Sequence, residues 1–220
     1  MLSKRLKQLR LAKGLSLESL AEAMGGIVTK QALSKYERDK AMPTIKVMKK
    51  LASSLNVKPA FLLTAPEYNI SFAAYRAKSK LTKKSQESIQ NLVAYSLEER
   101  LKLQELIAQD QEISIPINNF VVKNIEDCDI AADKMRIAWN LGSGSLDSIV
   151  NILEDHFVHV IEIESEDAFD GLSATALTID GQISAAAVVT RKHISGGRQR
   201  LNLTHELGHL VLDVDPGVDE

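Results

Sequence analysis

The 220-residue sequence predicts a mainly helical protein that ends in an α+β domain. Residues 2–63 contain five short segments with leucines at helical spacing, and residues 83–112 carry one long amphipathic pattern. Residues 159–189 then alternate apolar and polar side chains ahead of a last helical segment, which is an α+β order. We therefore expect a helical domain at 1–65, a linker with a long helix at 66–124, and an α+β domain at 125–220.

The composition is that of a globular protein, with 45% hydrophobic and 25% charged residues. No apolar run approaches the roughly 18 residues that a membrane helix needs. The first residues alternate charge and leucine and lack the apolar core of a signal peptide. The single cysteine, Cys128, cannot form an intramolecular disulfide, which suits a reducing compartment. We expect a cytoplasmic protein with no membrane partner.

The charge is distributed unevenly along the chain. Residues 1–65 hold 13 Lys and Arg against 4 Asp and Glu, whereas residues 125–220 hold 6 against 18. A basic first domain and an acidic last domain favour different partners, because a polyanion attracts the first and repels the second.

The first domain has start and stop signals for each helix. Gly14 ends the first helix, Ser16 can cap a second over residues 17–24, and Thr29 can cap a third. Pro43-Thr44 begins a fourth helix, in which Ile45, Met48, Leu51 and Ala52 are expected to be buried, and residues 57–63 close the bundle. The tight Gly25-Gly26 turn between the second and third helices makes this a helix-turn-helix layout.

In such a layout the third helix enters the major groove of double-stranded DNA. Gln31 suits an adenine edge and Lys30 a guanine edge, and neighbouring polar side chains suit bases or phosphates. The predicted contact residues are Thr29, Lys30, Gln31, Ser34, Lys35 and Lys40, with Lys13 and Arg38 beside the DNA backbone. The alternative is a solvated helix on a bundle that binds protein.

The residues GLSLESLAEAMG (14–25), TKQALSKYERDKAMPT (29–44) and KKLASSLNV (49–57) resemble the Xre (lambda repressor-like) helix-turn-helix family. The resemblance implies a DNA-binding transcription regulator, commonly a homodimer on near-palindromic sites. Asp39 stands where the family often has glycine, and an acidic residue can adopt the left-handed turn required there.

The linker pattern allows two interpretations. Ile89, Leu92, Val93 and Leu97 begin an apolar stripe that continues through Leu101, Leu106 and Ile107. This stripe could form a dimerisation helix, or it could pack on its own chain.

The last domain predicts two helices, at 130–141 and 146–157, with Trp139 as a core anchor. Strands follow at 159–163, 173–179 and 182–189, and Asp180-Gly181 predicts a two-residue hairpin between the last two. A final helix is expected from about Gly197 through Leu212.

That final helix carries the pattern H-E-x-x-H at His205, Glu206 and His209. Residues four apart share a helix face, so both imidazoles can bind one zinc ion. Glu206 would then act as the catalytic base for a water that the metal activates, as in a metallopeptidase. The alternative is two surface histidines on a terminal helix.

This half resembles the ImmA/IrrE zinc metallopeptidases, through FDGLSA (169–174) and GRQRLNLTHELGHLVLD (197–213). Members of that family are often fused to Xre-type regulators, and the resemblance implies cleavage of a repressor-type protein. The family's third zinc ligand is a glutamate on a further helix, well beyond the second histidine. The chain ends at Glu220, so the domain looks truncated, or else metal binding is weak. Asp215 is a poor substitute for this third ligand. Asp213 is expected on the same helical face as both histidines, where it would act as a supporting group.

Two functions follow from the sequence. The first is a DNA-binding regulator with a zinc metallopeptidase-like domain, which needs its third ligand in order to hold zinc. The second is a transcriptional repressor or antitoxin whose last domain is a non-catalytic sensor or interaction module.

Overall fold

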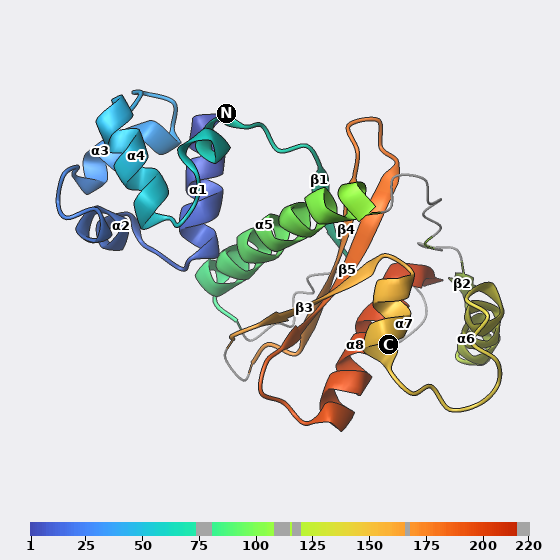
Figure 1. Ribbon diagram of the computed structural model, residues 1–220. Coiled ribbons are helices and arrows are strands. Elements are labelled where there is room, and N and C mark those ends of the chain that lie inside the picture. The colour runs from blue at the N-terminus through green and yellow to red at the C-terminus, as the bar shows by residue number, and fades with distance from the viewer. Residues whose placement is uncertain (74–80, 108–114, 116–119, 166–167, 215–220) are drawn as a thin grey trace. The chain divides into compact units, whose positions relative to one another are not determined.

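A computed structural model describes residues 1–73, 81–107, 115, 120–165 and 168–214. The described chain divides into two compact units. Unit 1 comprises residues 1–67 and 81–99, and unit 2 comprises the described residues 68–73 and those from 100 onward. The predicted fold class is confirmed, since a helical N-terminal region is followed by a C-terminal region with a small mixed sheet (Figure 1).

Unit 1 begins with the predicted helical bundle, drawn in blue and cyan in Figure 1. Hydroxyl side chains cap three of its helices: Ser16 accepts from the Ser19 N–H, and Thr29 and Thr44 accept from the third residue beyond each. The fifth segment is a short 3-10 helix rather than an α-helix. The elements are α1 (Leu2–Ala12), α2 (Leu17–Ala23), α3 (Lys30–Glu37), α4 (Ile45–Ser54) and η1 (Pro59–Leu63).

Leucines from every one of these elements meet in one core. Leu6, Leu20 and Leu33 are fully buried, as the helical spacing predicts. Ile45 was expected in this core and is 77% exposed, because it is the first residue of α4 and precedes the turn that packs. Asp39 adopts a φ of 54°, which confirms the predicted left-handed turn.

The long helix α5 (Lys83–Ile107) contributes residues to both units. Its apolar stripe is buried at Ile89, Val93, Leu97 and Leu101. In unit 1, both oxygens of Glu98 accept hydrogen bonds from the buried guanidinium of Arg5, with the Nη2–Oε1 pair at 2.7 Å. The first part of the stripe therefore packs on its own chain.

The end of that stripe differs from the prediction. Leu106 is 73% exposed and Ile107 is 83% exposed. Both lie in the last turn of α5, where the apolar pattern continues beyond the residues that pack. Residues 108–112, which were expected to extend this helix, lie outside the described part.

Unit 2 is built on a four-stranded sheet with the order β1-β4-β5-β3. The pairs β1–β4 and β4–β5 are antiparallel, and β3–β5 is parallel. A separate parallel pair joins β2 to β6. The elements are β1 (Asn69–Ala73), β2 (Phe120–Val122), α6 (Glu126–Ala138), α7 (Ile149–Asp155), β3 (Val158–Ile163), β4 (Gly171–Leu177), β5 (Ile183–Arg191), α8 (Gly196–Val211) and β6 (Leu212–Val214).

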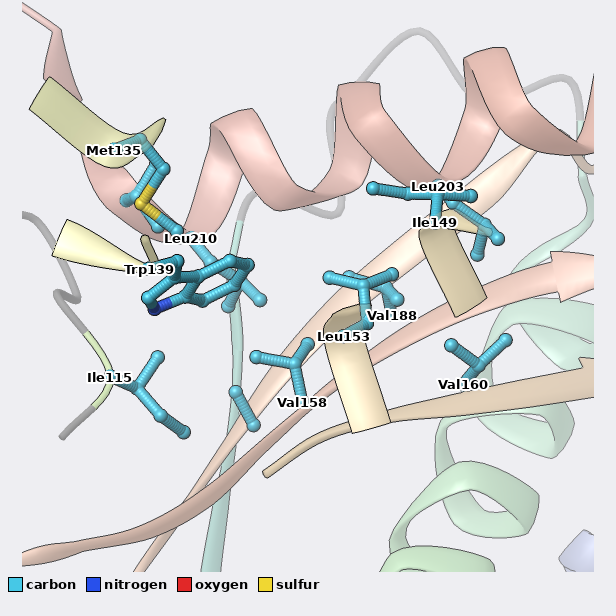
Figure 2. Close-up of a cluster of buried hydrophobic side chains, with 12 residues drawn as sticks. Ile115, Met135, Trp139, Ile149, Leu153, Val158, Val160, Val188, Leu203 and Leu210 are labelled. Carbon is cyan, nitrogen blue, oxygen red and sulfur yellow. The ribbon is translucent and has the colours of Figure 1, made fainter. Parts of the chain in front are cut away.

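The core of unit 2 lies between the sheet and helices α7 and α8 (Figure 2). Val158 and Val188 of the sheet meet Leu153 of α7 and Leu203 of α8 in this core. Trp139 is 6% exposed, as expected of a core anchor, and stacks on the His156 ring with a centroid separation of 4.3 Å. Leu203, Leu210 and Val211 of α8 belong to this core, so one face of the helix packs on the sheet.

Two local details of unit 2 differ from the predictions. The β4–β5 hairpin has a longer loop than two residues, because Thr178 N–H donates to the Gln182 carbonyl across residues 179–181. Gly181, with φ of 81°, supplies the left-handed residue of this loop. The short strands β2 and β6 were not predicted, and three residues are too few to give a periodic signal.

Among the described residues, no helix has the length and apolar character needed to cross a membrane.

Candidate functional site

The predicted DNA-contact residues mostly meet on one surface of unit 1. A hollow beside α3 is lined by Leu17, Lys30, Gln31, Ser34, Lys35, Arg38 and Lys40. Lys30, Gln31 and Lys35 are exposed on α3, whereas Leu33 on its opposite face is fully buried. The helical repeat of α3 thus places its buried side chain on one face and its exposed polar side chains on the other. We call this hollow the α3 surface.

Side-chain hydrogen bonds hold both ends of α3. Thr29 lies outside the α3 surface lining and caps the helix, accepting from the Ala32 N–H at 3.2 Å. At the other end, the buried pair Arg10–Glu37 ties α3 to α1 through two hydrogen bonds of 2.6 and 2.9 Å. One end of α3 is therefore capped, and the other end is tied to α1.

Lys30 forms an exposed ion pair with Glu18 of α2, at 3.1 Å between Nζ and Oε2. Exposed pairs of this kind are weak, so the amine can exchange the carboxylate for another acceptor. Lys13 is also exposed but does not line the α3 surface.

The second site is the H-E-x-x-H segment of α8. The side-chain ligand atoms of His205, Glu206 and His209 all lie within 4.8 Å of one another. The Nε2 atoms of the two histidines are 3.0 Å apart, and their rings meet edge to face. His205 is exposed, His209 is half-buried and Glu206 is 7% exposed. Helical spacing thus brings together all three residues that the sequence singled out.

Glu206 has an unusual environment for a carboxyl group. Burial against the sheet raises its pKa to about 7, the charge of Asp170 adds to the rise, and the Ser173 hydroxyl opposes it. A group with this pKa holds and releases a proton near neutral pH, which suits a general acid or base. Perturbed carboxyls of this kind are concentrated at functional sites.

The donor set of this segment fits a zinc ion. Two nitrogens bound to a tetrahedral zinc at 2.0–2.1 Å would be about 3.3 Å apart. The observed separation of 3.0 Å between the Nε2 atoms is close to that value. Imidazole nitrogens are also ligands that zinc prefers, and the Glu206 carboxyl lies beside them.

The prediction that Asp213 lies on the same helical face as both histidines is wrong. Helix α8 ends at Val211, and Asp213 lies in strand β6, where it is exposed. The helical pattern cannot place it on the histidine face, because Leu212 already adopts an extended conformation with ψ of 135°. Asp215 lies outside the described residues.

Sequence reasoning missed the partners of the predicted residues. Glu18 beside Lys30 was not anticipated, and neither were Asp170, Gly171 and Ser173 near Glu206. Asp170, Gly171 and Ser173 belong to the FDGLSA motif, so the sequence had already marked this segment. The sequence pattern does not show that β4 packs under α8, and it therefore could not place these residues beside Glu206.

Comparison with known proteins identifies the class of the first unit. Residues 6–62 match the model of a helix-turn-helix family. This segment, which contains most of α1 and all of α2 to α4, is therefore a helix-turn-helix domain.

Two transcription regulators are similar to part of the chain. The HTH-type transcriptional regulator SutR of Escherichia coli is 42% identical over 66 residues, which cover 30% of this chain and 36% of that protein. The SPbeta prophage-derived HTH-type transcriptional regulator YonR of Bacillus subtilis is 41% identical over 63 residues, which cover 29% of this chain and 56% of that protein. The chain thus spans between about a third and somewhat over half of these relatives. No solved structure matches the chain.

Proposed function

We propose that the chain is a transcription regulator that binds double-stranded DNA through the α3 surface. The observation that carries the proposal is the gathering of Lys30, Gln31, Ser34, Lys35, Arg38 and Lys40 around α3, one helix of a helix-turn-helix domain. Both similar proteins are named as transcription regulators of the same class.

The side chains of the α3 surface suit two kinds of DNA contact, to base edges and to phosphates. Gln31, near the N-terminus of α3, has the amide that pairs with an adenine edge, and Lys30 can donate to guanine once it leaves Glu18. Lys35, Arg38 and Lys40 supply cations for phosphates. Base contacts from the first turn of α3 and backbone contacts from its end would set both specificity and register.

The test begins with duplexes selected from a random library by the full chain. Gln31→Ala is expected to weaken binding to the selected duplex by about ten-fold or more, since a good bidentate base contact is worth about 1–3 kcal/mol. Its binding to an unselected duplex should be unchanged. Fluorescence anisotropy on labelled duplexes measures both. Equal affinities of variant and wild type for the selected duplex would contradict the proposal.

For unit 2 we propose a zinc site at His205 and His209, in a metallopeptidase-like domain of the ImmA/IrrE type. The convergence of the two Nε2 atoms beside the buried carboxyl of Glu206 supports it. Zinc, when bound, would act as a Lewis acid and lower the pKa of water there. The histidines would hold the ion, and Glu206 would accept a proton on its carboxylate and release it to a departing amine.

A catalytic zinc site usually has three protein ligands and one open position. Among the described residues, the cluster contains only His205, Glu206 and His209. We therefore propose cleavage of a repressor-type protein only for a state in which a third ligand is supplied. The experiment is hydrolysis of a quenched-fluorescent peptide library by the zinc-loaded chain in that state, with Glu206→Gln as the inactive control. Equal hydrolysis by both proteins would contradict the role of Glu206.

A second candidate for unit 2 is a non-catalytic sensor or interaction module. The observation that favours it is an apolar pocket of about 200 Å³ between α6, α7 and α8, whose lining includes Met135, Trp139, Ile149 and Leu207. In this case DNA binding persists without hydrolysis, and His205→Ala leaves the regulator intact. A zinc-loaded chain that releases no fluorescence from the peptide library even when the third ligand is supplied would favour this candidate.

A further inference from the structure

Glu206 lies directly against the backbone of Gly171, the first residue of β4. A Cβ atom built on Gly171 would be 2.6 Å from Glu206 Oε1, 2.8 Å from its Cγ and 2.9 Å from its Cδ. Unbonded carbon atoms pack at about 3.5–4.0 Å, so no side chain fits at residue 171 while Glu206 keeps its position.

The backbone itself does not require glycine at this position. Gly171 is not among the glycines with positive φ, unlike Gly142 and Gly181. It lies in a regular antiparallel register opposite Thr190 of β5. An ordinary residue would be expected in such a strand, because glycine is less stable there than alanine. Space for Glu206 is therefore the reason for glycine.

The face of α8 that carries Glu206 also binds Asp170, the residue before Gly171, through hydrogen bonds. Asn202 Nδ2 donates to the backbone carbonyl of Asp170 at 2.8 Å, and Arg198 Nη2 donates to its carboxylate at 2.7 Å. Residues 198, 202 and 206 are four apart, so they share one face of α8. The two hydrogen bonds fix the start of β4 on this face, and Glu206 lies one turn further along it.

We propose that Gly171 is the positioning residue for Glu206. Its bare backbone leaves a slot in which the carboxyl group stays buried beside His205 and His209, instead of turning outward to solvent. The proposal deepens the metal site proposed above and rests on it for its functional meaning. The geometry of the slot is independent of any metal.

A double-mutant cycle on the metal-free full chain tests the proposal. Gly171→Ala is expected to lower the Tm by at least about 4 °C, because the methyl group displaces Glu206 or β4. In a Glu206→Ala background the same substitution should lower the Tm by less than about 1 °C or raise it, since alanine then meets no carboxyl group and is favoured in a strand. This rescue shows that the cost of the methyl group comes from the Glu206 side chain and not from the strand itself.

Gly144→Ala is the matched control. Gly144 has no heavy atom within 4 Å of a built Cβ and no positive φ, so its substitution should change the Tm equally in both backgrounds. The proposal is overturned if Gly171→Ala leaves the wild-type Tm unchanged or lowers it equally with and without Glu206. A separate zinc titration of wild type decides the metal site. Absence of zinc binding would remove that proposed function, while the thermal cycle would still decide the role of Gly171.

Discussion

The candidate functional groups of the two units differ in burial: those of unit 1 are mostly exposed, whereas the central carboxyl group of unit 2 is buried. In unit 1, the α3 surface consists mainly of exposed cations, with the amide of Gln31 among them, around one helix on a buried leucine core. In unit 2, one carboxyl group is buried between helix and sheet with two imidazoles beside it, and its pKa is raised to about 7.

This difference agrees with the functions that we propose for the two surfaces. A polyanion is attracted by several exposed charges, each of which contributes a little and is screened by salt. A reaction needs a group whose proton affinity is tuned, and burial is the usual cause of such tuning. The contrast predicts distributed, modest effects of substitution on the α3 surface and concentrated, large effects at α8.

One of the two largest expected effects is on zinc binding. His209→Ala should weaken zinc affinity by more than about 100-fold, because loss of a direct ligand exceeds the 10–100-fold effect of supporting groups. Competition with a chromophoric chelator measures the affinity. His193→Ala, at an exposed histidine outside the cluster, is the control and should bind zinc like wild type. Equal affinity of the His209 variant and wild type would contradict the site.

The next effect concerns the core of unit 1. Arg5→Met leaves the buried Glu98 carboxylate without its guanidinium partner, and breaking a buried ion pair costs about 3–5 kcal/mol. Urea unfolding monitored by circular dichroism measures the loss. Lys7→Met breaks the exposed pair with Glu87 and should cost less than about 1 kcal/mol. Similar losses for both variants would show that the Arg5–Glu98 pair is not the stronger anchor.

The Glu206 carboxyl makes the stability of the metal-free chain depend on pH. Its pKa is raised from 4.5 to about 7 on folding, so its contribution is complete below pH 4.5 and is lost as pH rises through 7. A shift of this size corresponds to about 3 kcal/mol. Glu206→Gln should remove the decline, which urea unfolding between pH 4.5 and 8 measures. An unchanged decline in the variant would assign it to other groups.

The smallest expected effects are on the α3 surface. Lys35→Ala should weaken binding to any duplex by a similar factor and reduce the slope of log Kobs against log salt by about 1, as expected for one lost phosphate contact. Anisotropy titrations over a range of salt concentrations measure the slope. Lys7→Ala, beside Glu87 on another face, should keep the wild-type slope. A reduced slope for Lys7→Ala with none for Lys35→Ala would place the DNA on another surface.

The sequence was most informative where structure is local. Caps at Ser16, Thr29 and Thr44 and the spacing of leucines predicted the helices of unit 1, and i,i+4 spacing predicted the meeting of His205 with His209. These features depend on neighbours within one or two helical turns.

The features that sequence could not predict depend on distant partners. Leu106 and Ile107 continue an apolar pattern but remain exposed, because amphipathicity does not show where packing ends. The salt bridge of Glu98 with Arg5 joins residues 93 positions apart. The slot between Gly171 and Glu206 likewise depends on how β4 packs under α8, which no local pattern encodes.

The most direct test of the division between the units is one anisotropy measurement with the selected duplex and two variants of the full chain. The double variant His205→Ala/His209→Ala is expected to bind this duplex with the wild-type Kd, whereas Gln31→Ala is expected to bind it more weakly by about ten-fold or more. The opposite pattern, with DNA affinity lost in the histidine variant and kept in Gln31→Ala, would contradict the assignment of DNA binding to the α3 surface.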